Sequence, residues 1–202
     1  MSTIAIVYFS GGGHTHLMAE AIAAGVSATG HTPDLLRITG EQITAGRWQD
    51  DAVMARLAQA DAIVFGSPTY MGGVAAQFKA FIDAASSAWF VQQWQDKIAA
   101  GFTHSSSPSG DKQGTLLYLA IHAAQHGMVW VGATDMPSQY QGKTDGINRL
   151  GSFLGVMGQS PMTMDGSPAT IESGDRLTAE SFGRRIATAA ERWVAQKTPV
   201  AV

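Results

Sequence analysis

The sequence of 202 residues lacks cysteine, has few charged side chains and contains no long apolar run. Without cysteine, disulfides, thiolate metal ligands and cysteine nucleophiles are excluded. Charged residues make up only 14% of the chain. This share is low for a free surface, so part of the surface is expected to be buried in an oligomer. No apolar stretch approaches the roughly 20 residues of a membrane-spanning helix, and we therefore expect no membrane span.

Three further patterns are missing. No charged segment followed by an apolar one precedes the first apolar run, so we expect no signal peptide and a cytoplasmic protein. No long basic run is present and the net charge is -3, so nucleic acid is not an expected partner. His122 and His126 would share a helix face, but no H-E-x-x-H pattern surrounds them, and we expect no metal site.

What the sequence does contain is an alternation of short apolar runs with segments in which apolar residues recur at helical spacing. The runs predict strands at 4–9, 33–39, 62–65, 97–103 and 128–131. The helical spacing predicts helices near 17–25, 53–58, 74–85, 115–125 and 179–193. Residues 133–175 are rich in Gly, Ser, Pro and Gln, and they predict long loops with a short strand near 153–157. Residues 198–202 predict a frayed tail.

Alternating strands and helices predict one α/β domain over residues 1–202. We expect a flavodoxin-like three-layer fold, with a five-stranded parallel sheet in the order 2-1-3-4-5. In such sheets a ligand binds beyond the carboxyl ends of the strands, at the switch point between strands one and three. The segments after strands one, three and four therefore form the candidate site.

The segment after the first strand is rich in glycine and precedes a helix. Glycines let backbone N–H groups turn toward an anion, and the helix N-terminus adds partial positive charge. The pattern predicts a phosphate cradle, and a glycine turn without a ligand is the alternative. A nucleotide triphosphatase loop is disfavoured because no GK[ST] follows, and the G-x-G-x-x-G pattern is absent. The cradle would comprise Ser10, Gly11, Gly12, Gly13, His14 and Thr15.

The segments after strands three and four supply ring contacts and polar groups. After strand three, an aromatic and a thioether side chain could pack against a flat ring, although a surface turn is the alternative. After strand four, serines and main-chain N–H groups could bind the polar edge of a flavin, although a flexible linker is the alternative. The candidate residues are Pro68, Thr69, Tyr70, Met71 and Gly72 in one segment and His104, Ser105, Ser106, Ser107, Pro108 and Ser109 in the other.

Three ordered signatures across residues 3–132 resemble the WrbA-type NAD(P)H:quinone oxidoreductases. They are Tyr8-Phe9-Ser10 with Gly13-His14-Thr15, then Gly66 to Gly72, then His126-Gly127-Met128-Val129. The resemblance implies that 10–15 bind the FMN phosphate, that 69–71 lie beside the ribityl chain and ring, and that 104–109 surround the polar edge of the ring. It also implies NADH or NADPH as electron donor, a quinone acceptor, and a homo-oligomer, a dimer or a tetramer.

Three single positions bear on turnover in that family. Trp89 matches a tryptophan that reaches over the flavin of a neighbouring subunit and forms part of the substrate pocket, with a core or interface aromatic as the alternative. Gly12 stands where the family often has an aromatic residue linked to the nicotinamide cofactor. Gln125 takes the place of a histidine near the flavin, so the resemblance implies that Gln125 contacts the cofactor.

The leading hypothesis is a two-electron flavin reductase in which no side chain is a catalytic nucleophile, because the flavin carries the chemistry. Donor and acceptor would use one space in turn, which predicts ping-pong kinetics. A flavodoxin-type electron-transfer protein is the first alternative, but such carriers depend on a strongly acidic face, and a net charge of -3 gives that weak support. An FMN-binding regulatory protein with weak turnover is the second.

Overall fold

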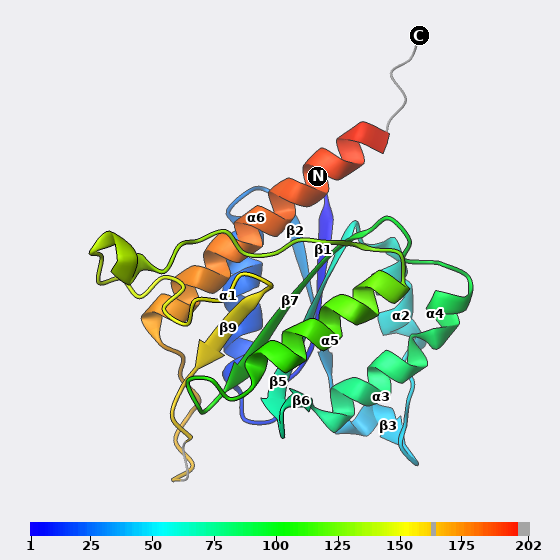
Figure 1. Cartoon of the computed structure of the whole chain (residues 1–202). Coiled ribbons are helices and arrows are strands. Elements are labelled where there is room, and N and C mark those ends of the chain that lie inside the picture. The colour runs from blue at the N-terminus through cyan, green and yellow to red at the C-terminus, as the bar shows by residue number, and fades with distance from the viewer. Residues whose placement is uncertain (163–164, 198–202) are drawn as a thin grey trace.

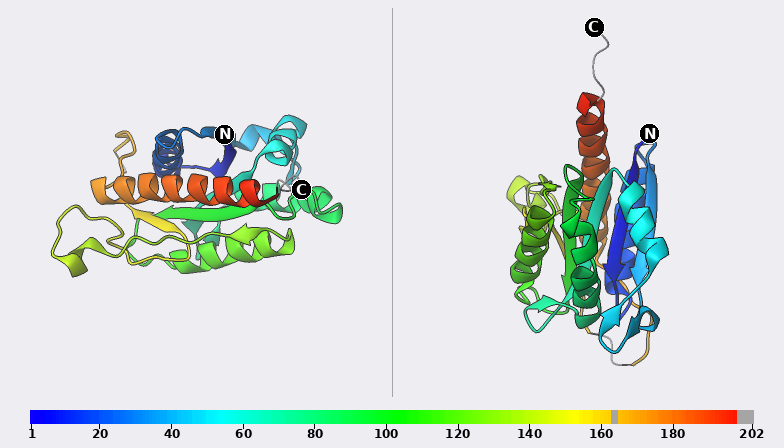
Figure 2. Two further views of the ribbon diagram at one scale, coloured as in Figure 1. Left: turned by 90° about the horizontal axis from the view of Figure 1, so that it is seen from above. Right: turned by 90° about the vertical axis from the view of Figure 1, so that its right-hand side faces the viewer.

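A parallel sheet with helices on both faces forms the body of the protein (Figures 1 and 2). The computed structural model describes residues 1–162 and 165–197, so the tail predicted at 198–202 lies outside the described residues. The main elements are β1 (Thr3–Phe9), α1 (His14–Ser27), β2 (Thr32–Ile38), α2 (Asp51–Gln59), β5 (Ala62–Tyr70), α3 (Ala76–Ala84), α4 (Ser86–Phe90), β7 (Ile98–Ser105), α5 (Lys112–Gln125), β8 (Val129–Trp130), β9 (Val156–Gln159) and α6 (Ser173–Lys197). Short elements are η1 (Gly40–Gln42), β3 (Ile43–Thr44), β4 (Arg47–Trp48), β6 (Gly73–Val74) and η2 (Ser138–Gln141).

The order of the strands is β2-β1-β5-β7-β8, which confirms the predicted order 2-1-3-4-5 of a flavodoxin-like fold. The strands alternate their side chains between two buried faces. On one face Ile4 and Ile6 pack under α1 and α6, and on the other Ala5 and Val7 belong to the core cluster that includes residues of α2, α3 and α5. Continuous apolar runs in β1, β5 and β7 are the expected consequence of burial on both sides.

The fifth strand is split in two. β8 pairs with Ile98 and Ala99 at the start of β7, whereas β9 pairs with Phe102 to Ser105 at its end. The intervening chain, 131–155, leaves the sheet and returns, and it carries η2. The short strand predicted near 153–157 is therefore found slightly later, at Val156–Gln159, and it completes the edge that β8 begins.

Two central strands are longer than their apolar runs. β5 continues through Tyr70 and β7 through Ser105, so the residues predicted as loops at 67–70 and 104–105 are strand. Parallel pairing of Ser67 with Thr103 and of Pro68 with His104 explains the extension. Pro68 is tolerated because the pairing of β5 with β1 ends at Gly66, so its missing N–H faces no neighbour strand there.

The helices also depart slightly from their predicted bounds. The predicted third helix at 74–85 is α3 at 76–84 followed by the short α4, which carries Trp89. α1 and α6 approach closely because Gly25 faces the carbonyl of Glu180 and Gly183 faces that of Ile22, and a Cβ at either glycine would clash with these atoms. Asp50 caps α2 by accepting a hydrogen bond from the amide of Val53 at 3.0 Å. Among the described residues, no helix combines the length and apolar character needed to cross a bilayer.

Candidate functional site

A cavity of about 660 Å³ opens at the carboxyl ends of β1, β5 and β7, where a flavodoxin-like sheet places its ligand. Segments from four parts of the chain line it. They contribute Gly12, His14, Thr15, Pro68, Thr69, Tyr70, Met71, His104, Ser105, Ser106, Ser107, Gly110, Ser160, Pro161 and Met162. Its volume lies within the range of about 300–1,000 Å³ typical of cofactor sites. All three predicted segments therefore meet at one cavity.

The glycine loop presents backbone donors at the start of α1. Gly13 is the N-cap residue with φ of 91°, a left-handed conformation that glycine adopts without strain. Because Gly13 has no side chain to cap the helix, the hydroxyl of Ser10 does so by accepting from the amide of His16 at 3.1 Å. Within the described part of the chain, the amides of Gly12 to Thr15 donate to no protein acceptor. With no acidic residue in the first turn, this end of α1 favours an anion.

Two histidine rings stack against each other in the cavity wall. The rings of His14 and His104 lie 4.8 Å apart with an interplanar angle of 13°. Ser160 donates its hydroxyl proton to the carbonyl of Thr170 at 2.8 Å, so it accepts from Nε2 of His104 at 3.2 Å. This fixes the proton of His104 on Nε2. Nε2 of His14 is buried with no hydrogen-bond partner among the described residues, so it is an unused polar atom in the wall.

Burial sets the charge of both rings. Burial, with the nearby His14, Lys112 and Arg149, lowers the pKa of His104 to about 3. Burial also lowers the pKa of His14. His104 is therefore a neutral ring at physiological pH, and it can stack on His14 without charge repulsion.

A tight hairpin between β5 and β6 forms the opposite rim. Tyr70 pairs with Gly73, so Met71 and Gly72 are the two turn residues, with φ of 48° and 80°. Positive φ at both positions defines a type I′ turn, in which methionine is an unfavourable choice. The Met71 side chain is fully exposed beside the cavity. The hydroxyl of Tyr70 lies over Gly11, where a Cβ would come within 2.5 Å of it.

Three buried threonines join the strands below the cavity. The hydroxyl of Thr69 forms hydrogen bonds of 2.8 Å with those of Thr103 and Thr115, linking β5, β7 and α5. Burial without such partners would cost about 1–3 kcal/mol per hydroxyl. The cluster therefore fixes the end of β5, from which Tyr70 and Met71 extend.

The segment after β7 is fixed from behind by a buried lysine. Lys112 is fully buried at the start of α5, and its ammonium group donates to Ser105 Oγ, Ser107 O and Pro108 O at 2.9, 2.7 and 2.9 Å. The carbonyl of Ser106 accepts from Gln159 at 2.9 Å. The segment is thus an ordered wall and not the flexible linker that its composition allowed.

Several predicted residues lie beside the cavity without lining it. Ser10, Gly11 and Gly13 shape the glycine loop. Gly72, Pro108 and Ser109 line a neighbouring cavity of about 500 Å³. Trp89 and Gln125 line another, of about 310 Å³, together with His122 and His126. Within one chain, Trp89 and Gln125 therefore do not reach the 660 Å³ cavity, and their assignment to a flavin site stays a prediction that needs a second chain.

Other residues of the site have no signal in the sequence. Ser160, Pro161 and Met162 line the cavity because β9 delivers them to the same edge as β7. Arg37 donates to the carbonyl of Ser10 at 3.0 Å and brings a positive charge to the glycine loop. A sequence prediction that placed a second half of the fifth strand at 156–159 would have indicated Ser160, Pro161 and Met162 as cavity residues. Among the described residues, no group of three potential metal-ligating side chains is found.

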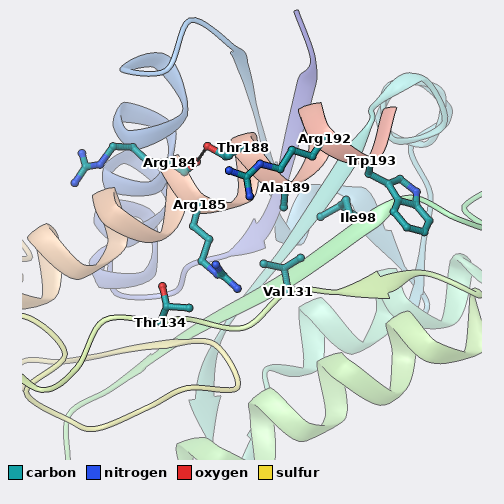
Figure 3. Close-up of a pocket in the computed structure, with 9 residues that line it drawn as sticks. All are labelled: Ile98, Val131, Thr134, Arg184, Arg185, Thr188, Ala189, Arg192 and Trp193. Atoms are coloured by element: carbon teal, nitrogen blue, oxygen red, sulfur yellow. Dashed lines mark hydrogen bonds between the residues drawn. The ribbon is translucent and has the colours of Figure 1, made fainter. Parts of the chain in front are cut away.

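A separate cavity of about 540 Å³ lies under α6, near the start of β7 (Figure 3). Arg184, Arg185 and Arg192 belong to its lining, and Arg185 donates to the carbonyl of Gly132 at 2.7 Å. The figure shows the arginine side chains spread in different directions along the exposed side of α6 and not converging on one point. None of the residues from the three predicted segments takes part in this cavity.

The fold and the position of the cavity define a flavodoxin-like protein. The chain belongs to the family of NADPH-dependent FMN reductases, because the sequence model of that family matches residues 4–143. A solved WrbA-like flavodoxin from Agrobacterium tumefaciens is 40% identical, with a TM-score of 0.70 over 95% of this chain and 99% of that chain. The family and the fold expected from the sequence are thereby confirmed.

Named relatives fall into two groups. Flavodoxin FldP of Pseudomonas aeruginosa is 42% identical over 189 residues, 93% of this chain and 96% of that protein. An NAD(P)H dehydrogenase (quinone) of Azorhizobium caulinodans is 34% identical over 184 residues, 87% of this chain and 85% of that protein. One of these relatives is thus named a flavodoxin and the other a quinone dehydrogenase.

Proposed function

We propose that this chain binds FMN in the 660 Å³ cavity and catalyses the two-electron reduction of quinones with NADH or NADPH. The observation that carries the proposal is the meeting of an anion-binding helix N-terminus with two ring-contacting walls in one cavity. The family description supports FMN, and the quinone dehydrogenases among the relatives support the acceptor class. FMN, when bound, supplies the redox chemistry, and no side-chain nucleophile is required.

The residues present fit a phosphorylated flavin. The free amides of 12–15 match a phosphate, and the buried, unpartnered Nε2 of the half-buried His14 supplies a further polar contact on the same loop. The exposed Met71 and half-exposed Tyr70 at the rim of the cavity match the flat ring. Serines 105–107 match the polar edge of the ring.

The roles of the chain's own groups follow from this fit. The glycine loop binds and orients the phosphate of the flavin, and the serine-rich wall holds the polar edge of its ring. His104, neutral and stacked, fixes His14. Because donor and quinone would occupy the same rim in turn, parallel lines in double-reciprocal plots are expected. Intersecting lines would contradict this order.

A direct test uses the purified chain with FMN, NADH or NADPH, and benzoquinone. Quenching of FMN fluorescence at micromolar protein is expected, followed by quinone-dependent oxidation of the nicotinamide. Riboflavin, which lacks the phosphate, is the matched control ligand and is expected to bind more weakly. Absence of FMN quenching would overturn the proposal as a whole, whereas quenching without turnover would leave only the cofactor site.

A flavodoxin-type electron carrier is the second candidate, because FldP is among the relatives and bears the name flavodoxin. A carrier of that kind is expected to accumulate a one-electron-reduced flavin during stepwise reduction. The reductase is expected to pass directly to the two-electron-reduced form. Anaerobic reduction followed by absorption spectroscopy separates the two.

The proposed enzyme is a homo-oligomer in which Trp89 covers the flavin of a second copy. Trp89, Phe90 and Val91 around α4 are 46%, 81% and 67% exposed, and Leu117 and Ile121 of α5 are exposed as well. Apolar side chains gathered at the surface are typical of an interface. This gathering supports the proposal of a dimer or a tetramer.

Replacing Phe90 with glutamate is expected to dissociate this oligomer. A buried interface aromatic commonly contributes about 2 kcal/mol or more to association, and the new carboxylate would have to be desolvated. Gel filtration at micromolar protein is expected to show a shift to the monomer, with unchanged circular dichroism. Glutamate in place of the exposed Val194 on α6 is the matched control and should leave the elution volume unchanged. A monomeric wild type would remove the proposal for Trp89.

A further inference from the structure

Lys112 is a fully buried lysine, and its surroundings require the charged form. Three acceptors surround its Nζ, namely Ser105 Oγ, Ser107 O and Pro108 O. Ser105 donates its own hydroxyl proton to Ser107 O at 3.1 Å, so it can only accept from the lysine. Three acceptors need three N–H donors, which an ammonium has and a neutral amine lacks. Burial lowers the pKa of Lys112, and these contacts oppose that effect by favouring the cation.

The backbone before α5 turns Lys112 under the cavity wall. Gly110 and Asp111 both have left-handed φ, of 54° and 53°, and reverse the chain before the helix begins at Lys112. Ser105, Ser106, Ser107 and Gly110 line the 660 Å³ cavity, whereas Lys112 does not. The ammonium group therefore lies directly behind the wall, with the segment 105–110 between it and the cavity.

Three carbonyls of this wall accept hydrogen bonds from side chains. Those of Ser107 and Pro108 accept from Lys112, and that of Ser106 accepts from Gln159. In the described part of the chain, the amides of Ser106 and Ser107 donate to no protein acceptor. Because these carbonyls already accept hydrogen bonds from Lys112 and Gln159, the amides of Ser106 and Ser107 are the backbone groups available to a ligand in the cavity.

The charged groups that act on Lys112 are Asp175, which raises the pKa of the lysine, and Arg149, which lowers it. Asp175 and Arg149 are themselves paired at 2.8 Å, so the carboxylate is shared with the guanidinium and does not contact the ammonium group alone. His104 is neutral, and Lys112 is one of the groups that lower its pKa. The field of Lys112 thus reaches a side chain that lines the cavity.

We propose that Lys112 is a positioning and redox-tuning residue of the flavin site, one that orders the 105–108 wall and favours the anionic two-electron-reduced flavin. The inference rests on the proposed binding of FMN. The oxidised ring is neutral, and uptake of two electrons and one proton, supplied together as hydride by the nicotinamide, gives a ring with one negative charge. A fixed cation behind the wall stabilises that anion more than the neutral ring.

The experiment compares neutral variants at this position by two readouts, the dissociation constant of oxidised FMN and the two-electron midpoint potential of the bound flavin. Lys112→Met removes the charge and all three hydrogen bonds. Lys112→Gln removes the charge but keeps amide donors, which protects the fold. Lys97→Met is the matched control, because Lys97 donates to the carbonyls of Ala58 and Ala60 at 2.9 and 2.5 Å, next to the opposite end of β7.

Both neutral variants at 112 are expected to lower the midpoint potential. A roughly tenfold loss of preference for the reduced flavin corresponds to about 30 mV for a two-electron couple. Oxidised FMN is expected to bind roughly tenfold more weakly to Lys112→Met, because methionine makes none of the three hydrogen bonds that order the wall, and less so to Lys112→Gln, which keeps amide donors. Lys97→Met is expected to keep the wild-type potential and affinity.

The outcomes separate this inference from the proposed function. If the wild type fails to bind FMN, the proposed function fails. If the wild type binds FMN and both neutral variants keep its potential, Lys112 has only a structural role and the tuning is overturned. A potential shift of the same size in Lys97→Met would also overturn it, because the effect would not depend on proximity to the cavity.

Discussion

Replacing Gly13 with valine is expected to eliminate the preference of this chain for FMN over riboflavin. Gly13 has φ of 91°, and a Cβ there would lie 2.8 Å from Cβ of Ala169. A β-branched residue at positive φ is strained by about 1–3 kcal/mol, so the loop is expected to adopt another conformation. The amides of Gly12 to Thr15 would then no longer converge on one phosphate.

The expected loss is large because several contacts fail together. Hydrogen bonds to a charged group contribute about 1.5–3 kcal/mol each, so loss of two weakens FMN binding roughly 100-fold or more. Riboflavin has no phosphate, and its affinity is expected to change much less. Fluorescence titration of both ligands measures the two affinities in the same variant.

Gly30 offers a control at the other end of α1. It has φ of 78° and nothing within 4 Å of its missing Cβ, so Gly30→Val introduces similar backbone strain away from the cavity. This variant is expected to be less stable but to keep the FMN preference. An unchanged preference in Gly13→Val, or an equal loss in Gly30→Val, would show that the glycine loop is not the phosphate site.

Local patterns predicted the parts of this site that depend on neighbours in the sequence. The glycine loop between an apolar run and an amphipathic segment is a local signal, and the structure places it at the N-terminus of α1. The sheet order followed from alternation and crossover handedness, which leave few arrangements for five parallel strands. The end of β5 was predicted too early, because pairing with β7 continues beyond the apolar run.

Long-range pairing explains what the sequence did not indicate. Ser160 to Met162 reach the cavity because β9 pairs with the end of β7, and the short strand predicted near 153–157 did not specify that pairing. Lys112 was not predicted because a lysine at a helix start is normally exposed, whereas here it follows the left-handed turn at 110–111 and is fully buried. Gln125 and Trp89 line a cavity of their own, so the resemblance applies to them only if a second chain brings that surface to the flavin.

Acidification is expected to destabilise the fold because three histidines are buried in the neutral form. Burial lowers the pKa values of His104 and His122 to about 3, with charged neighbours adding to the effect, and burial lowers that of His126 to about 4. His122 packs edge-on against Phe65 with the rings 5.2 Å apart, and His126 stacks on Trp94 at 4.4 Å. Nε2 of His122 and Nδ1 of His126 have no hydrogen-bond partner among the described residues. A proton on either ring would therefore be buried without an acceptor.

The sign follows from which state binds more protons. In the unfolded chain a histidine has a pKa of about 6.5, so between about pH 6.5 and the folded values the unfolded state is the more protonated one. Above that window the three histidines do not reduce the free energy of unfolding, and this free energy falls as the pH drops through the window. At about pH 5 each histidine is expected to cost about 2 kcal/mol, or about 6 kcal/mol for the three. Total stability of a domain is about 5–15 kcal/mol, so the chain is expected to approach unfolding.

Urea denaturation at about pH 7.5 and about pH 5, at one fixed flavin concentration, measures the effect. His122→Leu removes one of the titrating rings and is expected to recover about 2 kcal/mol of the acid-induced loss, even if the variant is less stable at the higher pH. Ser86→Ala lines the same cavity as His122 but removes no titrating group, so it should keep the wild-type loss. If His122→Leu loses as much stability on acidification as the wild type, the neutral buried histidine is not the source. The charged form of His122 would then be tolerated between Phe65 and Trp94, which its unpartnered Nε2 argues against.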